Sequence, residues 1–587
     1  MSPGGREASG RRAGGAGGRA QARPARRKGH TGRKGRKGRS PGGTSTDGRI
    51  RLLRIVFVVA FVLIGGKAIA LASSPGNLTA IAVRQQLREM TLPAPRGALL
   101  DRNGAELAVG REQRTVFATP YMLADRGSAA RELARALHLK KRQVLRELRG
   151  HSGFAYVARK VDPKLADKAM SLKLPGVGSY PEEKRVYPMR RLAMQVLGLA
   201  GTDNKGLAGL EYRYDHELAG RAGSQLVVRD PAGNPLKIVH AVQPRPGVDI
   251  RLTIDEAIQY TAEQVLARTV RQYQAKSATA IVENPQTGEI YAMANVPLVS
   301  PSTFASSLTQ ARNRAVTDAY EPGSTFKVVT VAGCLSDGLV KPSTSFWLQP
   351  SIKVADRVIH DAHLRPAERF TVRRILAESS NVGAVTLGEK LKEQGMLKWI
   401  AAFGFGHATG IDFPGEGSGI VPQDWSGSTI GNVPMGQGIG VTAVQMASAY
   451  SAIANGGLLL RPRLVSQVGD KVVGRKVIRR VLSPAVARQL TSMLSDAVAD
   501  GTGMEAQIPG YKVAGKTGTA QKALPNGLGY SQTKFVASFV GFVPAQRPQL
   551  VVLVVVDEPA QHYGGVVAAP AFRNIATFAL QHLEVAP

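Results

Sequence analysis

The hydrophobic and polar positions change abruptly near the start of the chain. Residues 1–50 contain Gly, Arg, Lys, Ala, Ser and Pro with almost no large apolar side chains. Such a stretch cannot bury enough surface to offset the entropy of ordering, so we expect a disordered tail over residues 1–51. An almost wholly apolar run of 18 residues follows, "IVFVVAFVLIGGKAIALA". Its length predicts a single transmembrane helix over residues 52–72.

The next stretch mixes helical and strand patterns without any recognisable catalytic motif. Residues 73–92 carry a helical pattern, and "ARELARALHLKKRQVLRELRG" has apolar positions spaced as in amphipathic helices. The fragment "DRNG" is a turn signal between two short apolar segments. We therefore predict an elongated, non-catalytic N-terminal pedestal module over residues 73–245.

A different pattern begins near residue 246. The fragments "SATAIVENPQTGEIYAMAN" and "FVASFVGFVPAQRPQLVVLVVVDEP" each read as two strands around a turn. A helix capped by Asp255 precedes the first pair, and another runs from a cap at Thr442 to Asn455-Gly456. This order predicts an α+β domain over residues 246–587, with an antiparallel sheet flanked by helices.

The charge of the chain bears on its location. The net charge is +34, and residues 1–54 hold 16 Lys and Arg against two acids. A nucleic-acid-binding arm is one interpretation of such a tail. The apolar run beside it favours another, because basic residues flank membrane spans on the cytoplasmic side. We expect the tail in the cytoplasm against anionic lipids of the inner membrane, with no specific nucleic acid, and the bulk of the chain outside the cell.

A cleaved signal peptide is the competing interpretation of the apolar run. The residues "ALA" at positions 70–72 have the small side chains that a signal peptidase requires. The basic tail is much longer than the n-region of a signal peptide, which favours an uncleaved anchor. A mature protein that starts at Ser73 would contradict the anchor.

The chain offers little for disulfide or metal chemistry. Its single cysteine, Cys334, lies in an apolar run and is predicted to be a buried core residue. The fragment "HDAH" places His360 and His363 three residues apart, but no third ligand accompanies them. We therefore expect no metal site and no cofactor, and a surface position for this fragment.

The fragment "YEPGSTFK" holds a serine and a lysine three residues apart, Ser324 and Lys327, before a long apolar segment. This spacing places both side chains on one face of a buried helix, with the serine at its N-terminus. Burial lowers the pKa of a lysine, so Lys327 could serve as the base for Ser324. The spacing alone occurs by chance in many chains and carries little weight.

Two further motifs give the serine–lysine pair its meaning. The fragment "ESSNVG" contains Ser379, Ser380 and Asn381, and "VAGKTGTAQK" contains a Lys-Thr-Gly sequence that starts at Lys516. S-x-x-K, S-x-N and K-T-G are the motifs of the penicillin-binding serine acyltransferases. Here they occur in that order, 55 and then 137 residues apart.

Together these motifs make the chain resemble a class B penicillin-binding protein, a peptidoglycan D,D-transpeptidase of the FtsI type. "RGALLDRNG" and "GLAGLEYRYD" resemble signatures of that family's dimerisation module, and the resemblance extends from residue 51 to the C-terminus. It implies a serine transpeptidase domain of the penicillin-binding and β-lactamase-like fold, with a five-stranded antiparallel sheet between helical clusters. It also implies cross-linking during septal wall synthesis, and as partners stem peptides, β-lactams, divisome proteins and a SEDS-family lipid II polymerase.

The resemblance assigns a role to each motif residue. Ser324 would attack the D-Ala–D-Ala carbonyl, Lys327 would take its proton, and Ser379 and Asn381 would relay the proton and hold the substrate amide. The backbone N–H groups of Ser324 and Thr519 would form the oxyanion hole. The catalytic set is completed by Lys516, and the predicted substrate-binding residues are Ser380, Thr517, Gly518 and Thr519.

Other functions remain open at this point. "GYKVAGKT" also matches a phosphate-binding P-loop, but the turn residues after it argue against the helix that such a loop needs. A β-lactamase is disfavoured because no E-x-x-L-N-like stretch follows the S-x-N motif. A D,D-carboxypeptidase, an elongation or sporulation transpeptidase, and a catalytically vestigial wall-assembly scaffold stay as alternatives.

Overall fold

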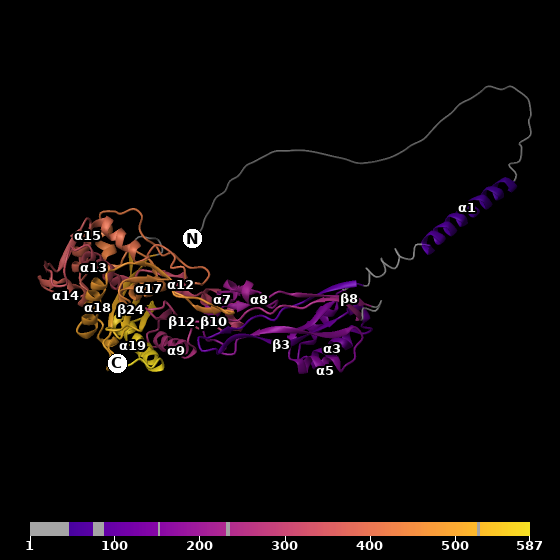
Figure 1. Ribbon diagram of the computed structural model, residues 1–587, viewed down its shortest axis with the longest axis horizontal. Helices are drawn as coiled ribbons and strands as arrows, with labels where there is room; N and C mark the ends of the chain where they lie inside the picture. Colours follow the sequence, from indigo (N-terminus) through magenta and orange to yellow (C-terminus); the bar gives the residue numbers. More distant parts are fainter. Residues whose placement is uncertain (1–45, 74–86, 151–152, 230–234, 525–528) are drawn as a thin grey trace, which may run out of the picture. The chain divides into compact units, whose positions relative to one another are not determined.

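The computed structural model describes residues 46–73, 87–150, 153–229, 235–524 and 529–587 (Figure 1). The chain forms two compact units, Met1–Gln85 and Gln86–Pro587. Most of the predicted disordered tail, residues 1–45, lies outside the described residues.

The first unit contains one described helix, α1 (Thr46–Ala72). The stretch Gly48–Ala72 is long and apolar enough to cross a membrane, and none of its most apolar window is buried. The helix begins at Thr46, earlier than the predicted start at residue 52. Residues 46–51 are therefore helical, which corrects the disorder expected for them.

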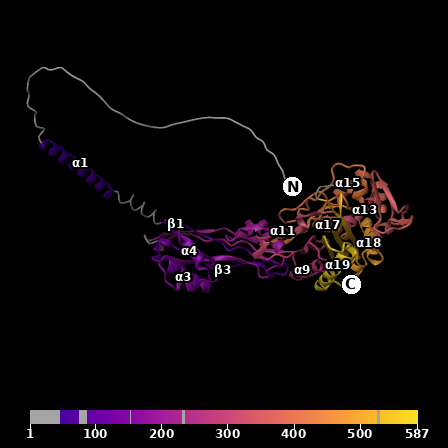
Figure 2. The ribbon, with the colours of Figure 1, turned by 180° about the vertical axis from the view of Figure 1, so that it is seen from behind.

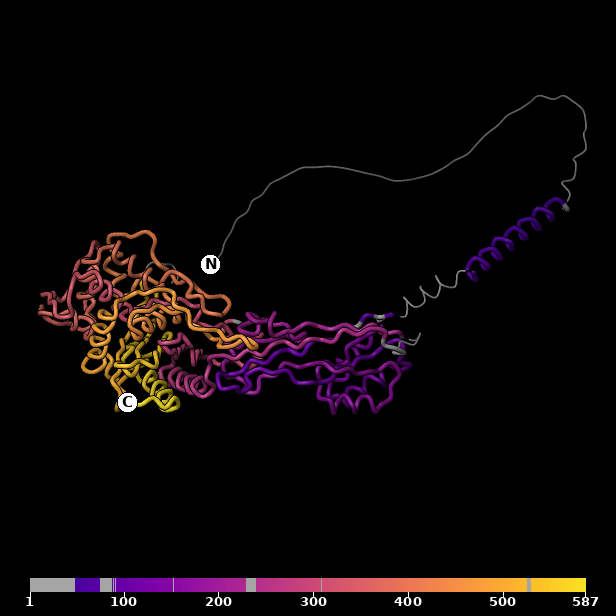
Figure 3. The backbone as a smooth tube through the Cα atoms, viewed as in Figure 1, coloured from indigo at the N-terminus to yellow at the C-terminus, as the bar shows by residue number. Residues whose placement is uncertain are grey.

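The N-terminal half of the second unit is built from strands far apart in the sequence. Its longest strand, β3 (Glu106–Ala118), pairs with three others. The strand order of the sheet is β21-β20-β10-β2-β3-β4, and β5 also pairs with β3. The sheet thus includes strands from residues beyond 460. Figure 3 shows the orange β20 segment beside the magenta β10 segment. The other strands of this sheet are β2 (Leu99–Leu100), β4 (Ala155–Val161), β5 (Val177–Val186), β10 (Ile250–Leu252), β20 (Val465–Val468) and β21 (Lys471–Val472).

A second sheet joins the start of this unit to a later hairpin. Its three strands are β1 (Leu87–Leu92), β8 (Gly223–Arg229) and β9 (Pro235–Val242), and β1 pairs antiparallel with β8. The helix predicted over residues 73–92 is therefore wrong for residues 87–92. These residues pair with a strand more than 130 positions away, which no local pattern reveals; residues 74–86 of that stretch lie outside the described residues.

A small helical lobe packs against strands β3, β4 and β5. Leu133, Val144 and Ala166, one from each of three helices, are fully buried in its own hydrophobic core. In both views the lobe lies at the same end of this unit as β1 and β8 (Figures 1 and 2). The lobe helices are η1 (Pro120–Met122), α3 (Arg126–Ala136), α4 (Lys141–Leu148) and α5 (Pro163–Met170).

A buried ion network ties the pedestal strands to two short helices. Glu211 is fully buried and pairs with Arg96 at 2.7 Å and with Arg185 at 2.6 Å. Arg96 also pairs with Asp215 at 2.7 Å. Removing one member of such a network would leave a buried charge without its partner, which destabilises a fold strongly. The short elements around it are α6 (Met194–Leu197), β6 (Leu199–Ala200), β7 (Gly206–Ala208), α7 (Gly209–Arg213) and α8 (Asp215–Ala219).

The C-terminal half contains the predicted five-stranded sheet, with the order β12-β11-β25-β24-β23 and every pair antiparallel. Successive side chains along a central strand enter opposite cores: Leu553 lies in one core and Val554 in the other. Both hairpins predicted from the sequence are present. The strands are β11 (Ser277–Glu283), β12 (Ile290–Val296), β23 (Ala514–Ala523), β24 (Tyr530–Val543) and β25 (Leu550–Asp557).

Helices cover both faces of this sheet (Figure 1). One face packs against α9 (Glu256–Gln272) and α19 (Gly564–His582), and the other against α13 (Lys327–Ser336) and α17 (Ala443–Ala454). Asp255 caps α9 and Thr442 caps α17, as the sequence predicts. The remaining helices are α10 (Pro301–Phe304), α11 (Leu308–Ala311), α12 (Arg314–Thr317), η2 (Gly323–Phe326), α14 (Val372–Ala377), α15 (Asn381–Ala402), α16 (Thr429–Asn432), η3 (Val433–Met435), α18 (Pro484–Ala499) and η4 (Met504–Ala506).

Several two-stranded sheets of short strands accompany the large sheet. They pair β13 with β18, β14 with β17, β15 with β16 and β19 with β22. The β14–β17 pair, and the β15–β16 hairpin between its strands, lie between the serine–lysine motif and the S-x-N motif in sequence. Their strands are β13 (Ala319–Tyr320), β14 (Ser345–Leu348), β15 (Ser351–Val354), β16 (Arg357–His360), β17 (Glu368–Thr371), β18 (Val441–Thr442), β19 (Leu458–Leu460) and β22 (Val477–Arg480).

Candidate active site

Ser324 lies in a single 3-10 turn, η2, that leads directly into α13. The backbone N–H of Lys327 donates to the carbonyl of Ser324, which fixes the turn between the two residues. Gly323 has a φ of 54°, and a Cβ there would lie 3.0 Å from the carbonyl oxygen of Thr519. The left-handed glycine therefore lets β23 approach the turn closely. Ser324 itself is half-buried, so its hydroxyl lies at a boundary between core and solvent.

Lys327 reaches from the start of α13 to the S-x-N motif. Its Nζ donates to the backbone carbonyl of Ser379 at 2.5 Å, to Ser379 Oγ at 3.2 Å and to Asn381 Oδ1 at 2.7 Å. The side chain is 1% exposed. This burial lowers the pKa of Lys327 to about 7, although the negative charge of Asp361 opposes the shift. The lysine can therefore be neutral at physiological pH.

The S-x-N motif spans the end of the α14–α15 loop and the first residue of α15, Asn381. Ser379 has a φ of 62°, an uncommon conformation for a residue with a side chain. Ser380 caps α15, because its Oγ accepts from the backbone N–H of Gly383 at 2.9 Å. The left-handed turn at Ser379 places both its carbonyl and its hydroxyl toward Lys327.

Asp361, which lies outside the motif in sequence, accepts hydrogen bonds from it. Its carboxylate accepts from the Ser380 hydroxyl at 3.0 Å and from the backbone N–H groups of Asn381 and Val382 at 2.5 and 3.0 Å. Arg365 donates to its other oxygen at 2.7 Å. A carboxylate at the start of a long helix is favoured by the free N–H groups there. Asp361 therefore fixes the first turn of α15, and with it the side chain of Asn381.

The K-T-G motif lies on the edge strand β23, and its lysine is fully buried. Lys516 Nζ donates to Thr502 Oγ1 at 3.2 Å and to Thr517 Oγ1 at 3.1 Å. Burial, and then the charge of Lys327, lower the pKa of Lys516 well below its ordinary value. The influence of Lys327 shows that the two lysines are neighbours. Burial is the first cause of the lowered pKa of each lysine.

Close backbone packing surrounds Gly518. A Cβ there would lie 2.3 Å from Ser538 Oγ and 2.9 Å from the carbonyl oxygen of Pro322, two residues before Ser324. On the neighbouring residue, Thr519 Oγ1 accepts from the backbone N–H of Gly564 at 3.1 Å. The strand that carries K-T-G thus rests directly against the turn that carries the serine.

The structure places Lys327 against Ser379 and Asn381, and the K-T-G strand against the turn that carries Ser324, while the Ser380 hydroxyl turns to Asp361. Three elements supply the motif residues: the η2–α13 junction, the α14–α15 junction and strand β23. Lys516 lies inside a strand, and β23 continues through the residues after it, so the P-loop alternative does not fit the fold. A groove of about 280 Å³ borders Ser379 and Thr502.

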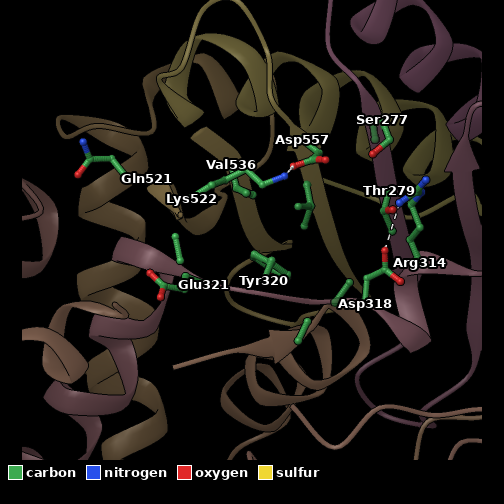
Figure 4. A pocket seen from close by; sticks show the side chains of 15 residues that line it. Ser277, Thr279, Arg314, Asp318, Tyr320, Glu321, Gln521, Lys522, Val536 and Asp557 are labelled. Carbon is green, nitrogen blue, oxygen red and sulfur yellow. Dashed lines mark hydrogen bonds and ion pairs between the residues drawn. The ribbon is translucent and has the colours of Figure 1, made fainter. Parts of the chain in front are cut away.

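A separate cavity of about 330 Å³ is lined in part by residues 318–321, the segment that leads to the serine (Figure 4). Two ion pairs line it, Arg314 with Asp318 at 3.2 Å and Lys522 with Asp557 at 2.8 Å. Tyr320, four residues before Ser324, also lines it. The cavity is distinct from the three motifs and supplies no residue that the sequence analysis assigned to the site.

Comparisons with known proteins agree with this architecture. The penicillin-binding protein transpeptidase domain matches residues 278–577, and the penicillin-binding protein dimerisation domain matches residues 91–252. The peptidoglycan D,D-transpeptidase FtsI of Escherichia coli is 31% identical over 545 residues, covering 91% of each chain. The stage V sporulation protein D of Bacillus subtilis is 34% identical over 565 residues, 92% of this chain and 86% of that protein.

The chain belongs to the class B penicillin-binding proteins. Among solved structures, penicillin-binding protein 3 of Mycobacterium tuberculosis in complex with aztreonam is 30% identical, with a TM-score of 0.67. The match covers 85% of this chain and 98% of that one. The chain is accordingly a serine transpeptidase of cell-wall synthesis, and its transpeptidase domain binds peptidoglycan stem peptides and β-lactams.

Two site residues of this penicillin-binding protein escaped sequence reasoning. Asp361 lies inside "HDAH", which was weighed only as a pair of metal-ligating histidines. His360 and His363 are exposed as expected, while the aspartate between them turns inward to α15. Thr502 lies in a Gly-rich turn with no chemical signature, and only its position beside Lys516 gives it a role.

Proposed function

We propose that this transpeptidase acts through an acyl-enzyme on Ser324. The Ser324 oxygen attacks the carbonyl between the two terminal D-alanines, and Lys327 takes the hydroxyl proton. The tetrahedral intermediate collapses, the C–N bond breaks, and the terminal D-alanine leaves with a proton. An amine of a neighbouring stem peptide then attacks the Ser324 ester, forms the cross-link and restores the serine hydroxyl.

The position of Lys327 carries this proposal. Its amine is buried, has a pKa of about 7, and lies one 3-10 turn from Ser324. A base of this pKa is half neutral near physiological pH, which suits general base catalysis. Ser379 bonds to the same amine at 3.2 Å and is placed to share the proton.

The other motif residues take substrate-binding roles in this proposal. The Asn381 amide accepts from Lys327 and donates to the carbonyl of His360 at 2.9 Å. In this proposal it would hold the stem-peptide backbone together with Ser380. The terminal carboxylate would be held by residues of the edge strand β23: Lys516, Thr517 and Thr519. Gly518 lets this strand lie close to the turn that carries Ser324. The backbone N–H groups of Ser324 and Thr519 would stabilise the oxyanion, a contribution of about 3–4 kcal/mol for a single donor in serine enzymes.

The test is covalent labelling with a fluorescent penicillin. Ser324→Ala should abolish labelling, because no other residue supplies the attacking oxygen in this proposal. Ser336→Ala is the matched control, since Ser336 lies at the far end of the same α13 helix and should leave labelling unchanged. Labelling that survives in Ser324→Ala would show that the nucleophile is a different residue.

A transpeptidase is distinguished from a carboxypeptidase by the fate of the acyl-enzyme. Stem-peptide donor and acceptor are supplied together, and cross-linked dimer is measured against hydrolysed peptide. We expect the dimer to predominate. A product that consists only of hydrolysed peptide would favour the carboxypeptidase. If the protein is folded but forms neither product, the scaffold would be favoured.

We also propose a single-pass topology and a septal location. Residues 1–51 would lie in the cytoplasm against anionic lipids, α1 would span the membrane, and residues 73–245 and 246–587 would form the pedestal and the transpeptidase domain outside. The basic flank of α1 and the similarity to FtsI support this placement. A SEDS-family lipid II polymerase and other divisome membrane proteins would be its partners there.

Localising a fluorescent fusion in growing cells tests the division role. Signal concentrated at septa is expected. Even signal along the lateral wall would indicate an elongation role, and signal confined to the forespore envelope would match the name of the sporulation relative. Either of these outcomes would contradict the septal proposal without touching the chemistry of Ser324.

A further inference from the structure

The helical lobe of the pedestal carries an unusual excess of positive charge. Residues 121–180 contain 13 Lys and Arg against five Asp and Glu, a net charge of +8. All residues after 54 together carry +20, so this short segment holds two-fifths of that charge. Nothing in the transpeptidase chemistry uses it.

The charge is concentrated on the outer face of α4 and its flanks. Val144 and Leu148 are fully buried against the lobe core, so the opposite side of the helix faces solvent. Arg142, Arg146 and Arg149 follow each other at the i, i+4 and i+7 positions and are all exposed. Residues at these spacings form one stripe along a helix.

The basic side chains of this stripe are left largely without partners. Among the described residues Arg146 pairs with Glu147 at 3.4 Å, while Lys140, Arg142 and Arg149 form no ion pair. A shallow groove of about 490 Å³ runs between these side chains. Like charges four residues apart destabilise a helix, so the stripe costs stability unless an external anion compensates it.

The tether to the membrane determines which anion is closest. The candidate membrane helix ends at Ala72 and β1 begins at Leu87, so 14 residues connect them. A fully extended segment of this length spans at most about 50 Å. Strand β1 and the lobe share one end of the second unit, away from the transpeptidase sheet (Figures 1 and 2). If α1 spans the membrane, the linker would keep the start of β1 within about 50 Å of the bilayer, and the lobe lies at the end of the second unit that carries β1.

We propose that the outer face of α4 binds the phosphodiester headgroups of anionic phospholipids in the membrane that holds α1. Arg142, Arg146 and Arg149, assisted by Lys140 and Lys141, form the contact surface. Guanidinium groups bind phosphate oxygens through paired hydrogen bonds, which suits this stripe. Such a contact would set the orientation of the pedestal above the bilayer, and so the height at which the transpeptidase domain meets its substrate.

The experiment uses the full chain in lipid nanodiscs. The only native cysteine, Cys334, is fully buried, so a fluorophore can be placed on Gln143→Cys, which lies on the α4 face. Lipids with spin-labelled headgroups quench that fluorophore only at contact range. Quenching is expected in discs with phosphatidylglycerol and not in discs of phosphatidylcholine alone. It should disappear as salt rises from about 0.1 M to about 1 M, where the screening length falls from about 10 Å to about 3 Å.

Charge variants give the proposal its control. Reversing Arg142, Arg146 and Arg149 to Glu should reduce quenching about tenfold, whereas replacing all three by Lys should retain it. Reversing Lys471, Arg475 and Lys476 to Glu changes the net charge equally at exposed positions outside the lobe and should have no effect. Fluorescent penicillin labelling of Ser324 is measured on the same discs. It reports whether the chain is folded and reactive, independently of the quenching that reports lipid contact.

Three results would overturn the membrane contact. The first is equal quenching in neutral and anionic discs, and the second is equal loss with either set of reversals. The third is a variant with Arg142, Arg146 and Arg149 reversed to Glu that is still quenched but no longer binds a purified anionic wall polymer. That result would show that the stripe binds the polymer and not the lipid.

Discussion

At the scale of single residues, Lys327 is the group whose protonation governs reactivity. Burial lowers the pKa of its amine to about 7, and the nearby carboxylate of Asp361 acts against that shift. Three oxygen acceptors from Ser379 and Asn381 surround the amine. The amine can accept a proton from Ser324 only when it is neutral, so the reaction should follow its titration.

We predict that acylation by a β-lactam rises with pH through about 7. Below that value the neutral fraction of Lys327, and hence the acylation rate, should fall about tenfold per pH unit. Above it the rate should level off. The second-order rate constant for acylation, measured from pH 5 to pH 9 by stopped-flow fluorescence, checks this. A profile without an inflection near 7 would exclude Lys327 as the titrating base.

Asp361→Asn separates the charge of Asp361 from its shape. The amide is close in size but neutral, so the pKa of Lys327 should fall and the inflection should move to lower pH. A merely structural role would lower the rate at every pH without moving the inflection. Asp356→Asn is the matched control, because that exposed carboxylate lies on the same hairpin and should leave the profile unchanged.

The sequence predicted the motif residues because each belongs to a short pattern with fixed spacing. Ser324, Lys327 and Lys516 could be named without a structure. Asp361 could not, because its role comes from the fold of the β15–β16 hairpin, which carries it across 20 positions to the first turn of α15. Thr502 was equally hidden, since nothing in its neighbourhood encodes contact with Lys516.

At the scale of elements, the site depends on how closely β23 approaches η2. The hydrogen atom of Gly518 occupies the space that a methyl group would need beside Ser538 and the carbonyl of Pro322. Strand and turn are in direct backbone contact at Gly518 and Gly323, so their separation is set by tight packing. A small change in that separation would displace the K-T-G residues relative to Ser324.

Gly518→Ala should therefore impair acylation. The added Cβ would meet Ser538 Oγ on β24 at 2.3 Å and the backbone carbonyl oxygen of Pro322 at 2.9 Å, so β23 and the turn would be pushed apart. A misplacement of about 1 Å can cost about 100-fold in rate, and we expect a loss of that order in penicillin acylation. Gly474→Ala is the control, because a Cβ there meets nothing within 4 Å. An unchanged acylation rate in Gly518→Ala would show that the strand position is not limiting.

The elements themselves were predictable where their signals are local. The caps at Asp255 and Thr442 and the two long hairpins follow from nearby residues. Strand β1 was mistaken for a helix because "LREMTL" has no clear periodicity and acquires its structure only by pairing with β8. Pairing across such a distance is decided by the tertiary fold.

At the scale of the whole second unit, a buried carboxyl group forms a hydrogen bond between the transpeptidase domain and the pedestal. Glu263 lies on α9, and its Oε1 accepts from the backbone N–H of Ala193 in the pedestal at 2.8 Å. Gln259 donates to the same oxygen at 2.8 Å. Burial raises the pKa of Glu263 to about 7, because the hydrogen bonds only partly compensate the loss of solvent. The junction therefore contains a group that titrates in the physiological range.

This titration makes the stability of the unit depend on pH. In the unfolded chain the carboxyl of Glu263 has its ordinary pKa of 4.5, whereas in the folded unit it is about 7. The contribution of Glu263 to the free energy of unfolding is therefore complete below pH 4.5. It is lost as pH rises through 7, by about 3 kcal/mol in total. Glu263→Gln cannot ionise, so its urea midpoint should change less between pH 5 and pH 8 than that of the wild type. Glu393→Gln, which removes an exposed carboxylate, should behave like the wild type. Parallel pH dependence in the Glu263→Gln variant and the wild type would place the titrating group elsewhere in the unit.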